Sequence, residues 1–542
     1  MTSSFHFPIP ENEITYSFAP GTKERKLLQE ELINLRSKHI DIPLYIGGEE
    51  IFTNHKADIF PPHDLNLKLG TYSVGDKTHV QQAIDAALAA KAKWSATPWK
   101  ERAKIFLKAA DLVSQKWRYK ILASTMLGQS KNVYQAEIDA ACELADFLRF
   151  NVYFMEKIYN DQPSSTSEIS NRVEYRPLEG FVFALTPFNF TAIAANLFAA
   201  PALMGNTVVW KPNEAQAYSA YFLMGIFKEA GLPDGVINMV IADGPVVGDV
   251  IFNHRDFAGL HFTGSTKVFK SLWKTIGNNI EKYKTYPRIV GETGGKDFVM
   301  AHPSADVQVV ITALSRGAFE YQGQKCSAAS RAYIPQSLWP VVKDGLLKDI
   351  ASFKIGPTEN FENFINAVID KKAFDRIVSY IENIKSSKEA DILIGGGHDE
   401  SNGYFIEPTV VLTKDPKYKT MCEEIFGPVL TIYVYDDDQF EETLKLIDET
   451  SEYALTGAIL SEDRFAILEA LKILENAAGN IYINDKPTGA VVNQQPFGGA
   501  RSSGTNDKAG SFINLLRWTS ARTIKENLNP PKEYRYPFME KE

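Results

Sequence analysis

The sequence predicts a two-domain α/β protein in which helices cover mostly parallel sheets. The chain has 542 residues, which is too long for one ordinary hydrophobic core. Hydrophobic residues make up 44% and charged residues 23% of it, the balance of a globular protein. Two stretches alternate short apolar runs with segments of helical periodicity. Because strand–helix–strand repetition is typical of doubly wound sheets, each stretch predicts one α/β domain.

The first expected elements are helical. Between Lys77 and Val113, apolar residues recur every three to four positions in two separate sets, and a third helix is expected over residues 137–149. Residues 1–60 mix short polar pieces with prolines. We interpret these residues as an arm that lies on the main body.

The first alternation begins at Gly180. Its expected strands cover residues 181–185, 207–210, 236–241 and 260–262, and its expected helices cover 217–230 and 267–277. The weakly polar stretch Thr191–Gly205 contains Asn196 and Pro201 and is too short to cross a membrane. We therefore expect a buried helix there.

The second alternation begins near Asp297. Its expected helices cover residues 307–321 and 340–350, and its expected strands lie near 331–334, 429–435 and 457–459. Two α/β domains in tandem, with a cleft between them, follow from this pattern. The expected divisions are an arm over 1–60, a first domain over 61–290, a second domain over 291–485 and a return segment over 486–542.

Charge and cysteine usage exclude several classes of protein. The net charge is -9 and no Lys/Arg run forms a basic face, which argues against nucleic-acid binding. The three cysteines, Cys142, Cys326 and Cys422, form no CxxC pair, and the nine histidines are scattered. A zinc site or a disulfide framework is therefore not expected, and no metal is called for. A reducing compartment follows from the same pattern.

The N-terminal residues resemble no common targeting signal. They are acidic and contain no Lys or Arg before Lys23. This composition matches neither a secretory signal nor an Arg-rich mitochondrial presequence. A presequence that had been removed would leave the same pattern, so the location stays open at this point.

Cys326 is the first candidate for chemistry. It follows an expected helix and lies among small and polar residues, with Gly323 just upstream. A thiol in such a place can be partly exposed and reached by backbone N–H groups, which favour the thiolate. A single cysteine is more often inert than catalytic, and that alternative stays open from the local sequence alone.

Glu292 and Asn189 are the next candidates. Glu292 lies between glycines at an expected strand end, where its carboxylate can act as a base toward a thiol or a water. Asn189 lies between two phenylalanines directly after the strand 181–185. A rigid Asn amide there can donate to a developing oxyanion. The alternatives are a solvated Glu in a surface turn and an Asn that only forms a turn.

Candidate cofactor-binding segments lie at two further strand ends. No GxGxxG fingerprint occurs. Residues 262–266 instead place Gly264 and Ser265 at the start of an expected helix, which suits a pyrophosphate. At the end of another strand, Lys211 can donate to ribose hydroxyls and Glu214 can accept from them.

Seven motifs occur in a fixed order along the chain. They are PFNF at 187–190, WKPNE at 210–214, FTGS at 262–265, GETGGK at 291–296, QGQKCSA at 322–328, EEIFGPV at 423–429 and PFGG at 496–499. In this order and spacing, the chain resembles the aldehyde dehydrogenase superfamily from about residue 40 to near the C-terminus. The resemblance implies an aldehyde dehydrogenase-like fold: two doubly wound α/β domains, one NAD-binding and Rossmann-like, one catalytic, and a β-hairpin oligomerisation arm over 165–178.

The resemblance also implies roles for these residues. Cys326 would be the nucleophile, Glu292 the general base, and Asn189 with the backbone N–H of Cys326 the oxyanion hole. NAD would be the cofactor, with Lys211 and Glu424 on its two riboses. The other cofactor-binding residues that the resemblance implies are Thr186, Glu214, Gly264, Ser265, Thr266, Lys267 and Val268.

A narrower resemblance concerns the substrate. The stretch 484–507, with Phe319-Glu-Tyr and Lys325-Cys-Ser-Ala, resembles the subfamily that oxidises L-glutamate γ-semialdehyde, formed from δ-1-pyrroline-5-carboxylate, to L-glutamate in proline degradation. The likeness implies that Ser327 and the backbone amides of Gly489 and Ala490 hold the substrate carboxylate. Some relatives have Ser at the position of Ala490, so one hydroxyl contact is missing here. The remaining implied contacts are Phe190 and Phe497 on the aliphatic stem and Glu143 near the amino end.

Two rival functions stay open, as do the partners. The first rival is an aldehyde dehydrogenase for a different semialdehyde. The second is an inactive member kept as a binding protein, which intact Cys326, Glu292 and Asn189 argue against. The resemblance implies a homodimer or higher homo-oligomer, with residues 168–177 and 518–524 as its arms, and proline dehydrogenase as a candidate partner. It implies the mitochondrial matrix, with the cytoplasm as the alternative, and neither nucleic acid nor membrane insertion is expected.

Overall fold

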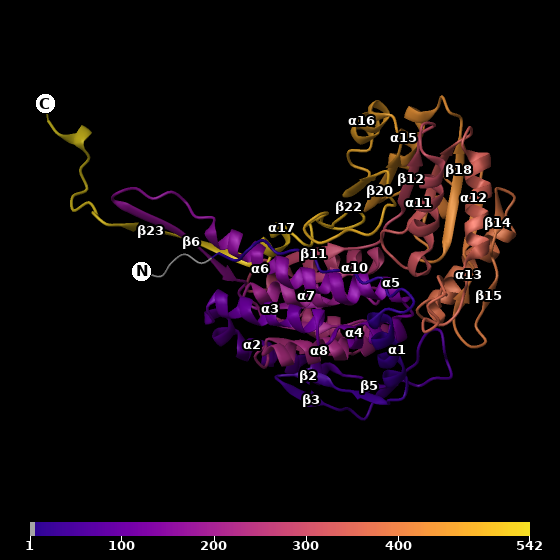
Figure 1. Cartoon of the computed structure of the whole chain (residues 1–542). Helices are drawn as coiled ribbons and strands as arrows, with labels where there is room; N and C mark the ends of the chain where they lie inside the picture. The colour runs from indigo at the N-terminus through magenta and orange to yellow at the C-terminus, as the bar shows by residue number, and fades with distance from the viewer. Residues whose placement is uncertain (1–5, 542) are drawn as a thin grey trace.

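The chain forms two α/β units and a long two-stranded ribbon that projects from the first of them (Figure 1). This computed structural model describes residues 6–541. Each unit is built on its own seven-stranded sheet. The predicted two-domain α/β class is therefore confirmed.

The first sheet has the strand order β11-β10-β7-β8-β9-β2-β3. Its strands are β2 (Leu44–Ile46), β3 (Glu49–Ile51), β7 (Phe181–Leu185), β8 (Val208–Lys211), β9 (Ile237–Met239), β10 (Phe257–Thr263) and β11 (Arg288–Glu292). Strands β7 to β11 are parallel, whereas β2 and β3 are antiparallel additions. After β9 the chain returns to the other side of β7. This reversal creates a switch point between β7 and β10, where open α/β sheets bind ligands at the carboxyl ends of their strands.

Helices cover both faces of this sheet. They are α2 (Lys77–Ala96), α3 (Trp99–Ser114), α4 (Arg118–Gln129), α6 (Leu144–Asn160), α7 (Thr191–Leu203), α8 (Ala217–Ala230), α9 (Gly244–Ile251) and α10 (Thr266–Asn278). The expected buried helix is confirmed, since almost every residue of α7 is buried although Pro201 lies inside it. The helix expected over 137–149 is longer and irregular. It comprises α5 (Val133–Ala136), a π-helical turn (Glu137–Glu143) and α6, and a π-bulge leaves no periodicity from which to predict it.

The second sheet has the order β14-β17-β18-β13-β12-β20-β21. Its strands are β12 (Asp297–Ala301), β13 (Ala329–Pro335), β14 (Ala390–Ile394), β17 (Thr409–Thr413), β18 (Val429–Tyr435), β20 (Thr456–Leu460) and β21 (Asn480–Ile483). The helices of this unit are α11 (Val307–Phe319), α12 (Trp339–Ser352), α13 (Lys371–Lys385), α14 (Lys419–Cys422), α15 (Phe440–Glu449) and α16 (Arg464–Ile473). The helix expected to reach residue 321 ends at Phe319. Tyr321 and Gln322 have left-handed backbones, with φ of 53° and 55°, which an α-helix cannot contain.

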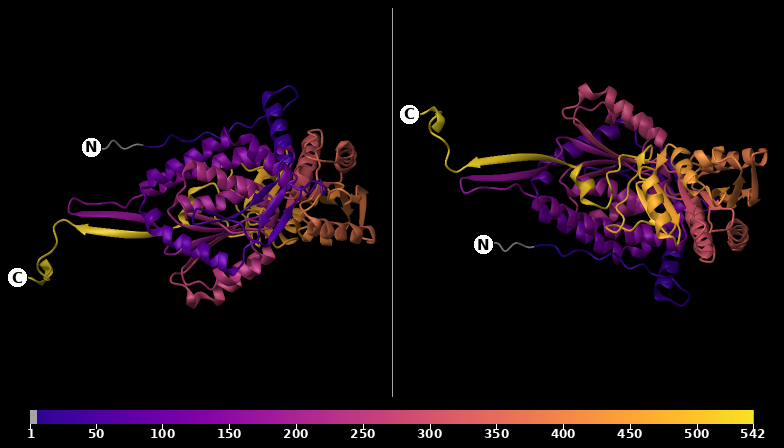
Figure 2. Two further views of the ribbon diagram at one scale, coloured as in Figure 1. Left: turned by 90° about the horizontal axis from the view of Figure 1, so that it is seen from below. Right: turned by 90° about the horizontal axis from the view of Figure 1, so that it is seen from above.

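A smaller part of the N-terminal region forms an arm than expected. Helix α1 (Lys23–Arg36) packs on the first unit through three buried leucines, and β2 and β3 join the first sheet. A small sheet of β1 (Ile40–Ile42), β4 (Lys56–Ile59) and β5 (Gly70–Ser73) follows. Three-residue strands carry too little alternation to be predicted. Only the segment before α1 is extended, and it runs along the outside of the helical layer (Figure 2).

The projecting ribbon consists of β6 (Ile169–Pro177) and β23 (Thr519–Asn527), which pair antiparallel along their whole length. The two expected arms therefore pair with each other, and neither folds back onto its own unit (Figure 2). Trp518, which was expected to begin the second arm, is instead fully buried in the first unit with its ring 4.6 Å from that of His261. Backbone groups on the outer edge of β6 bond to side chains of the preceding segment, Asn171 to Ser165 and Val173 to Gln162. The outer edge of β23 has no strand partner among residues 6–541.

The remaining short elements are β15 (His398–Asp399), β16 (Phe405–Ile406), β19 (Tyr453–Ala454), β22 (Ala500–Arg501) and α17 (Phe512–Leu516), with 3-10 turns at 214–216, 280–282, 320–323 and 537–539. Over residues 6–541, no helix is both long enough and apolar enough to span a membrane.

Candidate active site

The candidate residues of the first unit gather at one edge of its sheet. Thr186 follows β7, Lys211 ends β8, Gly264 follows β10 and Glu292 ends β11. These four strands are parallel neighbours, so their carboxyl ends meet along the same edge. Segments far apart in the sequence thus form one surface beside the switch point.

Cys326 lies in the second unit, in the turn that leads into β13. The two units meet here because the Asn189 side chain Nδ2 donates to the Gln324 backbone oxygen at 3.1 Å. Asn189 is buried. An Asn amide has two N–H donors, so one of them remains for a ligand beside the thiol.

The turn before Cys326 is held in an unusual backbone conformation. The Tyr321 hydroxyl donates to the Gln129 backbone oxygen at 2.9 Å. The Gln322 side chain donates to the backbone oxygens of Ser130 and Ala367 at 3.1 and 2.9 Å. These bonds fix two left-handed residues that are rarely stable without such support. The position of Cys326 is therefore imposed by the surrounding structure.

The Cys326 thiol differs from the expected thiolate. It is half-buried, and burial raises its pKa well above the ordinary value; the negative charges of Glu292, Asp297 and Glu424 raise the pKa further. A backbone hydrogen bond at Cys326 lowers the pKa as expected, but burial and the three carboxyl groups outweigh it, so the thiol form is favoured. The thiol must therefore lose its proton to a nearby base when substrate is present.

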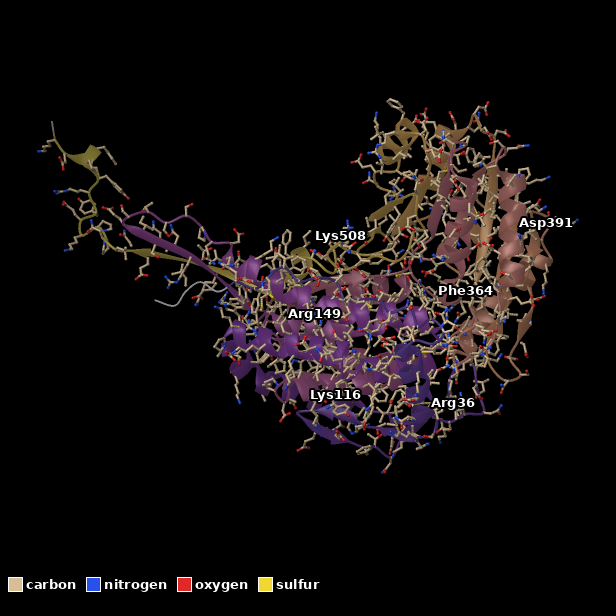
Figure 3. The ribbon with its side chains drawn as sticks, viewed as in Figure 1. Arg36, Lys116, Arg149, Phe364, Asp391 and Lys508 are labelled. Carbon is tan, nitrogen blue, oxygen red and sulfur yellow. The ribbon has the colours of Figure 1, made fainter. Side chains whose placement is uncertain are left out.

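Glu292 is half-buried at the end of β11. Burial raises its pKa to about 8, Lys508 opposes this rise, and Asp507 adds to it. A carboxyl group whose pKa lies near neutral pH is suited to accept and release protons. Lys508 lies on the C-terminal return segment, where the two units adjoin (Figure 3).

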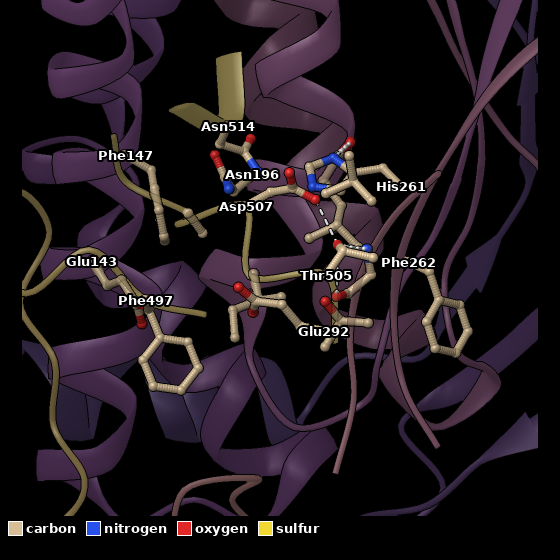
Figure 4. A pocket seen from close by; sticks show the side chains of 16 residues that line it. Glu143, Phe147, Asn196, His261, Phe262, Glu292, Phe497, Thr505, Asp507 and Asn514 are labelled. Carbon is tan, nitrogen blue, oxygen red and sulfur yellow. Dashed lines mark hydrogen bonds between the residues drawn. The ribbon is translucent and has the colours of Figure 1, made fainter. Parts of the chain in front are cut away.

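A small enclosed cavity of about 30 Å³ adjoins Glu292 (Figure 4). Its polar lining includes Asp507 and Thr505, whose hydroxyl donates to Asp507 Oδ2 at 2.5 Å. Glu143 and Phe497 also border it. A polar cavity of this size has room for an ordered water. Glu292 thus borders a small chamber with polar groups in its wall, and its charge acts on the Cys326 thiol.

A larger cavity of about 360 Å³ contains the remaining candidates. Its walls include Cys326, Ser327, Glu143, Phe190, Phe497, Gly489 and Ala490. The structure therefore brings together all the residues that the sequence analysis associated with the substrate. Five segments widely separated along the chain contribute to this cavity.

Polar groups in this cavity face its interior from opposite sides. The Ser327 hydroxyl is hydrogen-bonded to that of Thr488 at 2.7 Å. Gly489 has φ of +101°, which favours glycine. The loop Gly489–Gln495, here called the anchor loop, follows. On another wall, burial and then the charge of Asp139 raise the pKa of Glu143 well above its ordinary value.

Three charged residues at the site were missed by the sequence analysis. Glu320 accepts from Lys325 at 3.0 Å and from Lys486 at 2.7 Å. Burial raises the pKa of Glu320, but the two ammonium groups outweigh it and lower that pKa to about 2. Lys325 stands next to Cys326, and its partner Glu320 is close in sequence, but Lys486 lies 166 positions from Glu320, too far for a sequence pattern to indicate the pair.

The cofactor candidates form a polar surface beside the switch point. Lys211 Nζ lies 2.7 Å from Glu214 Oε1, and Trp210 Nε1 donates to the Thr186 hydroxyl at 3.0 Å. Ser265 caps helix α10 by accepting from the backbone N–H of Val268 at 3.3 Å. Ser265, Lys267 and Val268 are exposed at the start of this helix, and Thr266 is buried beneath them. An exposed helix N-terminus with a neighbouring ammonium fits a dinucleotide.

Glu424 lies apart from Lys211, in the second unit. It accepts from the Gly295 backbone N–H at 2.9 Å, and a Cβ atom at Gly294 would lie only 2.3 Å from Glu424 Oε2. Burial raises the pKa of Glu424 to about 7. This arrangement explains the glycine pair after Glu292, because the carboxylate lies directly over it.

Among residues 6–541, no cluster of three or more His, Cys, Asp or Glu side chains is arranged to hold a metal ion.

Comparisons with known proteins agree with this geometry. Residues 52–524 match the model of the aldehyde dehydrogenase family. The chain is 54% identical to a mitochondrial delta-1-pyrroline-5-carboxylate dehydrogenase of Dictyostelium discoideum, covering 98% of this chain and 96% of the relative. It is 49% identical to that of Mus musculus, covering 98% and 94%. The crystal structure of delta-pyrroline-5-carboxylate dehydrogenase from Mycobacterium tuberculosis bound with NAD matches with a TM-score of 0.96 at 51% identity, covering 100% of both chains.

Proposed function

The chain belongs to the aldehyde dehydrogenase family, and from this premise we propose that it oxidises L-glutamate γ-semialdehyde to L-glutamate with NAD. The observation that carries this proposal is the 360 Å³ cavity, which contains Cys326, the anchor loop and Glu143 together. An amino-acid aldehyde carries a carboxylate, an ammonium and a reactive carbon, and the cavity offers a group for each.

Three contacts would orient the substrate. The Ser327 hydroxyl and the backbone N–H groups of Gly489 and Ala490 would hold the carboxylate. Glu143 would face the ammonium. Burial disfavours the ionised form of the Glu143 carboxyl group, and the positive charge of the ammonium would favour it. Phe190 and Phe497 would pack on the aliphatic stem. The aldehyde carbon then lies at the thiol.

The first chemical step uses Cys326 and Glu292. Glu292 accepts the thiol proton, and the sulfur adds to the aldehyde carbon, whose oxygen becomes an oxyanion. The free N–H of Asn189 and the backbone N–H of Cys326 donate to that oxygen. Such donors contribute about 3 to 4 kcal/mol to acyl-transfer transition states.

The cofactor surface supports the oxidation. Lys211 and Glu214 would hold ribose hydroxyls, and Gly264 and Ser265 at the start of α10 would hold the pyrophosphate. NAD, when bound, accepts the hydride that the substrate carbon loses, which leaves a thioester on Cys326.

Glu292 then acts a second time. After the thiol proton has left Glu292 for solvent, the carboxylate takes a proton from a water, the hydroxide adds to the thioester carbon, and the carbon–sulfur bond breaks to release glutamate and the thiolate. The polar chamber bordered by Thr505 and Asp507 lies beside Glu292 and can store that water.

Substrate preference tests the proposal. NADH formation should be measured with δ-1-pyrroline-5-carboxylate, which is in equilibrium with the semialdehyde, and with pentanal, which lacks both charged groups. Paired charged groups give large discrimination, so we expect kcat/KM to differ by at least about 100-fold in favour of the amino-acid aldehyde. Equal values, or a preference for another semialdehyde, would contradict the proposal.

We also propose that the enzyme works in the mitochondrial matrix and receives its substrate from proline dehydrogenase. Two relatives that cover nearly the whole chain carry the word mitochondrial in their names. Imaging of the native full-length gene product tests the location, and a cytoplasmic signal would contradict it.

A further inference from the structure

The N-terminal segment forms one wall of the substrate cavity. Residues His6–Phe18, here called the strap, have no helix or strand of their own. Asn12, Glu13 and Thr15 of the strap line the same cavity as Cys326 and Gly489. A segment that packs on the site without regular structure needs its backbone N–H groups satisfied elsewhere.

Carboxylates on one long helix satisfy these groups. The backbone N–H of Phe7 donates to Glu156, that of Glu13 to Asp146 and that of Tyr16 to Glu137, at 2.8, 2.8 and 2.9 Å. The strap therefore runs antiparallel to the helix that spans 137–160. Its length from Phe7 to Tyr16 is about 30 Å of extended chain. The helix from Glu137 to Glu156 is about 28 Å long, so the strap and the helix have nearly equal lengths between their bonded residues.

Side chains fasten the strap at its middle. Glu13 accepts from Arg118 at 2.8 Å, from Arg149 at 2.6 Å and from the Ser114 hydroxyl at 2.7 Å. Arg118 is buried, and Arg149 lies on α6 in the helical layer of the first unit (Figure 3). The strap thus occupies a fixed place, with Asn12 directed toward the cavity wall.

Asn12 connects the helix with the anchor loop. Its Nδ2 donates to Asp146 Oδ2 at 2.8 Å and to the Val492 backbone oxygen at 3.0 Å. Its Oδ1 accepts from Gln494 Nε2 at 2.9 Å. Within residues 6–541, every hydrogen bond between the anchor loop and another segment of the chain involves Asn12.

We propose that Asn12 is a positioning residue that sets the distance between the anchor loop and Cys326, and thereby the specificity for aldehydes that carry a carboxylate. The inference rests on the proposed function, since it assumes that the loop binds the substrate carboxylate. Asn12 contacts neither thiol nor substrate stem. Its loss should therefore weaken carboxylate binding and leave the chemical step intact.

Kinetics of Asn12→Ala test this inference. For glutamate semialdehyde, the variant should raise KM about tenfold, because a displaced anchor loop loses about one hydrogen bond to the substrate carboxylate, while kcat changes less than twofold. For pentanal, kcat/KM should stay unchanged. Ile14→Ala is the matched control, since Ile14 lies on the strap with its side chain 69% exposed. It should leave both substrates unaffected.

Three outcomes separate the hypotheses. An unchanged KM in Asn12→Ala, or an equal loss with both aldehydes, overturns the role of Asn12. If Asn12→Ala does not fold, Gln494→Ala removes one of the two hydrogen bonds between Asn12 and the loop, and KM for glutamate semialdehyde should rise by a smaller factor, with an unchanged KM overturning the inference as well. A wild-type enzyme that does not prefer the carboxylate-bearing aldehyde contradicts the proposed function instead, before any variant is compared.

Discussion

Lys131 and Asp139 form a fully buried ion pair, with Lys131 Nζ 2.8 Å from Asp139 Oδ2. The two residues connect the loops that carry Asn189 and Cys326. Asp139 accepts the backbone N–H groups of Thr191 and Ala192 at 3.0 and 2.8 Å and so caps helix α7 directly after Asn189. The Lys131 ammonium lies 4.0 Å from the Phe190 ring centre and 4.6 Å from that of Tyr321.

Substitution of Lys131 by Met should therefore weaken both the fold and catalysis. Removing one partner of a buried pair costs about 3 to 5 kcal/mol because a buried charge is left without its partner. We expect a lower Tm by calorimetry and a lower kcat, since both loops lose their common contact. Lys108→Met, on the exposed side of α3, is the control and should change neither. An unchanged Tm in Lys131→Met would refute this role.

Cys326→Ala should abolish dehydrogenase activity and leave NAD binding intact. The side chain provides the attacking sulfur, and removal of a nucleophile lowers kcat by at least about a thousandfold. Calorimetric titration with NAD measures the binding. Cys422→Ala is the matched control, since that half-buried thiol lies outside the cavity. Substantial turnover by Cys326→Ala would mean that the nucleophile is a different residue.

The hydrolysis of the thioester should depend on pH through Glu292. The carboxylate form acts as the base, and its fraction increases as pH rises through the pKa of about 8. The single-turnover rate of thioester decay should therefore rise with pH and reach half its maximum near pH 8. Asp507 raises the pKa of Glu292, so Asp507→Asn should move this inflection to lower pH. A decay rate that is flat from pH 6 to 10 would exclude this base.

NAD should be strongly preferred to NADP. The Glu214 carboxylate beside Lys211 can accept from a free ribose hydroxyl but repels a phosphate at that position. Its side chain is 42% exposed, so screening limits the effect, and Glu214→Gln should reduce the preference by on the order of tenfold. Glu281→Gln, an exposed change elsewhere in the first unit, should leave the ratio of kcat/KM unchanged. Comparable efficiencies of the wild type with both cofactors would refute the assignment.

The ribbon of β6 and β23 should mediate a dimer. The outer edge of β23 has no strand partner among residues 6–541, and a two-fold contact would cover this edge, as proteins normally do. Sedimentation at micromolar concentration should show a species of at least twice 60.6 kDa. A species near 60.6 kDa would contradict the dimer. Deletion of residues 520–542 retains the buried Trp518 and should shift the protein toward monomer.

Much of the fold followed from periodicity in the sequence. The apolar runs at 181–185 and 429–435 correspond to β7 and β18 without change, because buried parallel strands give short continuous apolar segments. The backbone of Tyr321 and Gln322 could not be predicted. It depends on hydrogen bonds to Ser130 and Ala367, which lie far away in the sequence.

The residues of the site were predicted from sequence motifs, whereas their electrostatic environment became visible only in the structure. The substrate residues lie in one cavity as the resemblance implied, but the raised pKa of Cys326 results from burial and then from the charges of Glu292, Asp297 and Glu424. The strap was interpreted only as part of an arm. Its role depends on the pairing of Asn12 with Val492, across 480 positions of sequence, and no local pattern indicates such a contact.

The central claim is that Cys326 carries the substrate as a thioester that Glu292 releases. The most direct test is mass spectrometry of Glu292→Gln after mixing with δ-1-pyrroline-5-carboxylate and NAD, with NADH measured in parallel. We predict that about one NADH per site forms and that formation then stops, with one glutamyl group on the peptide that contains Cys326. This single turnover should be slower than the first turnover of the wild type, because the thiol of the variant must lose its proton to solvent. NADH formation without an adduct, or an adduct on Cys142 or Cys422, would contradict the account.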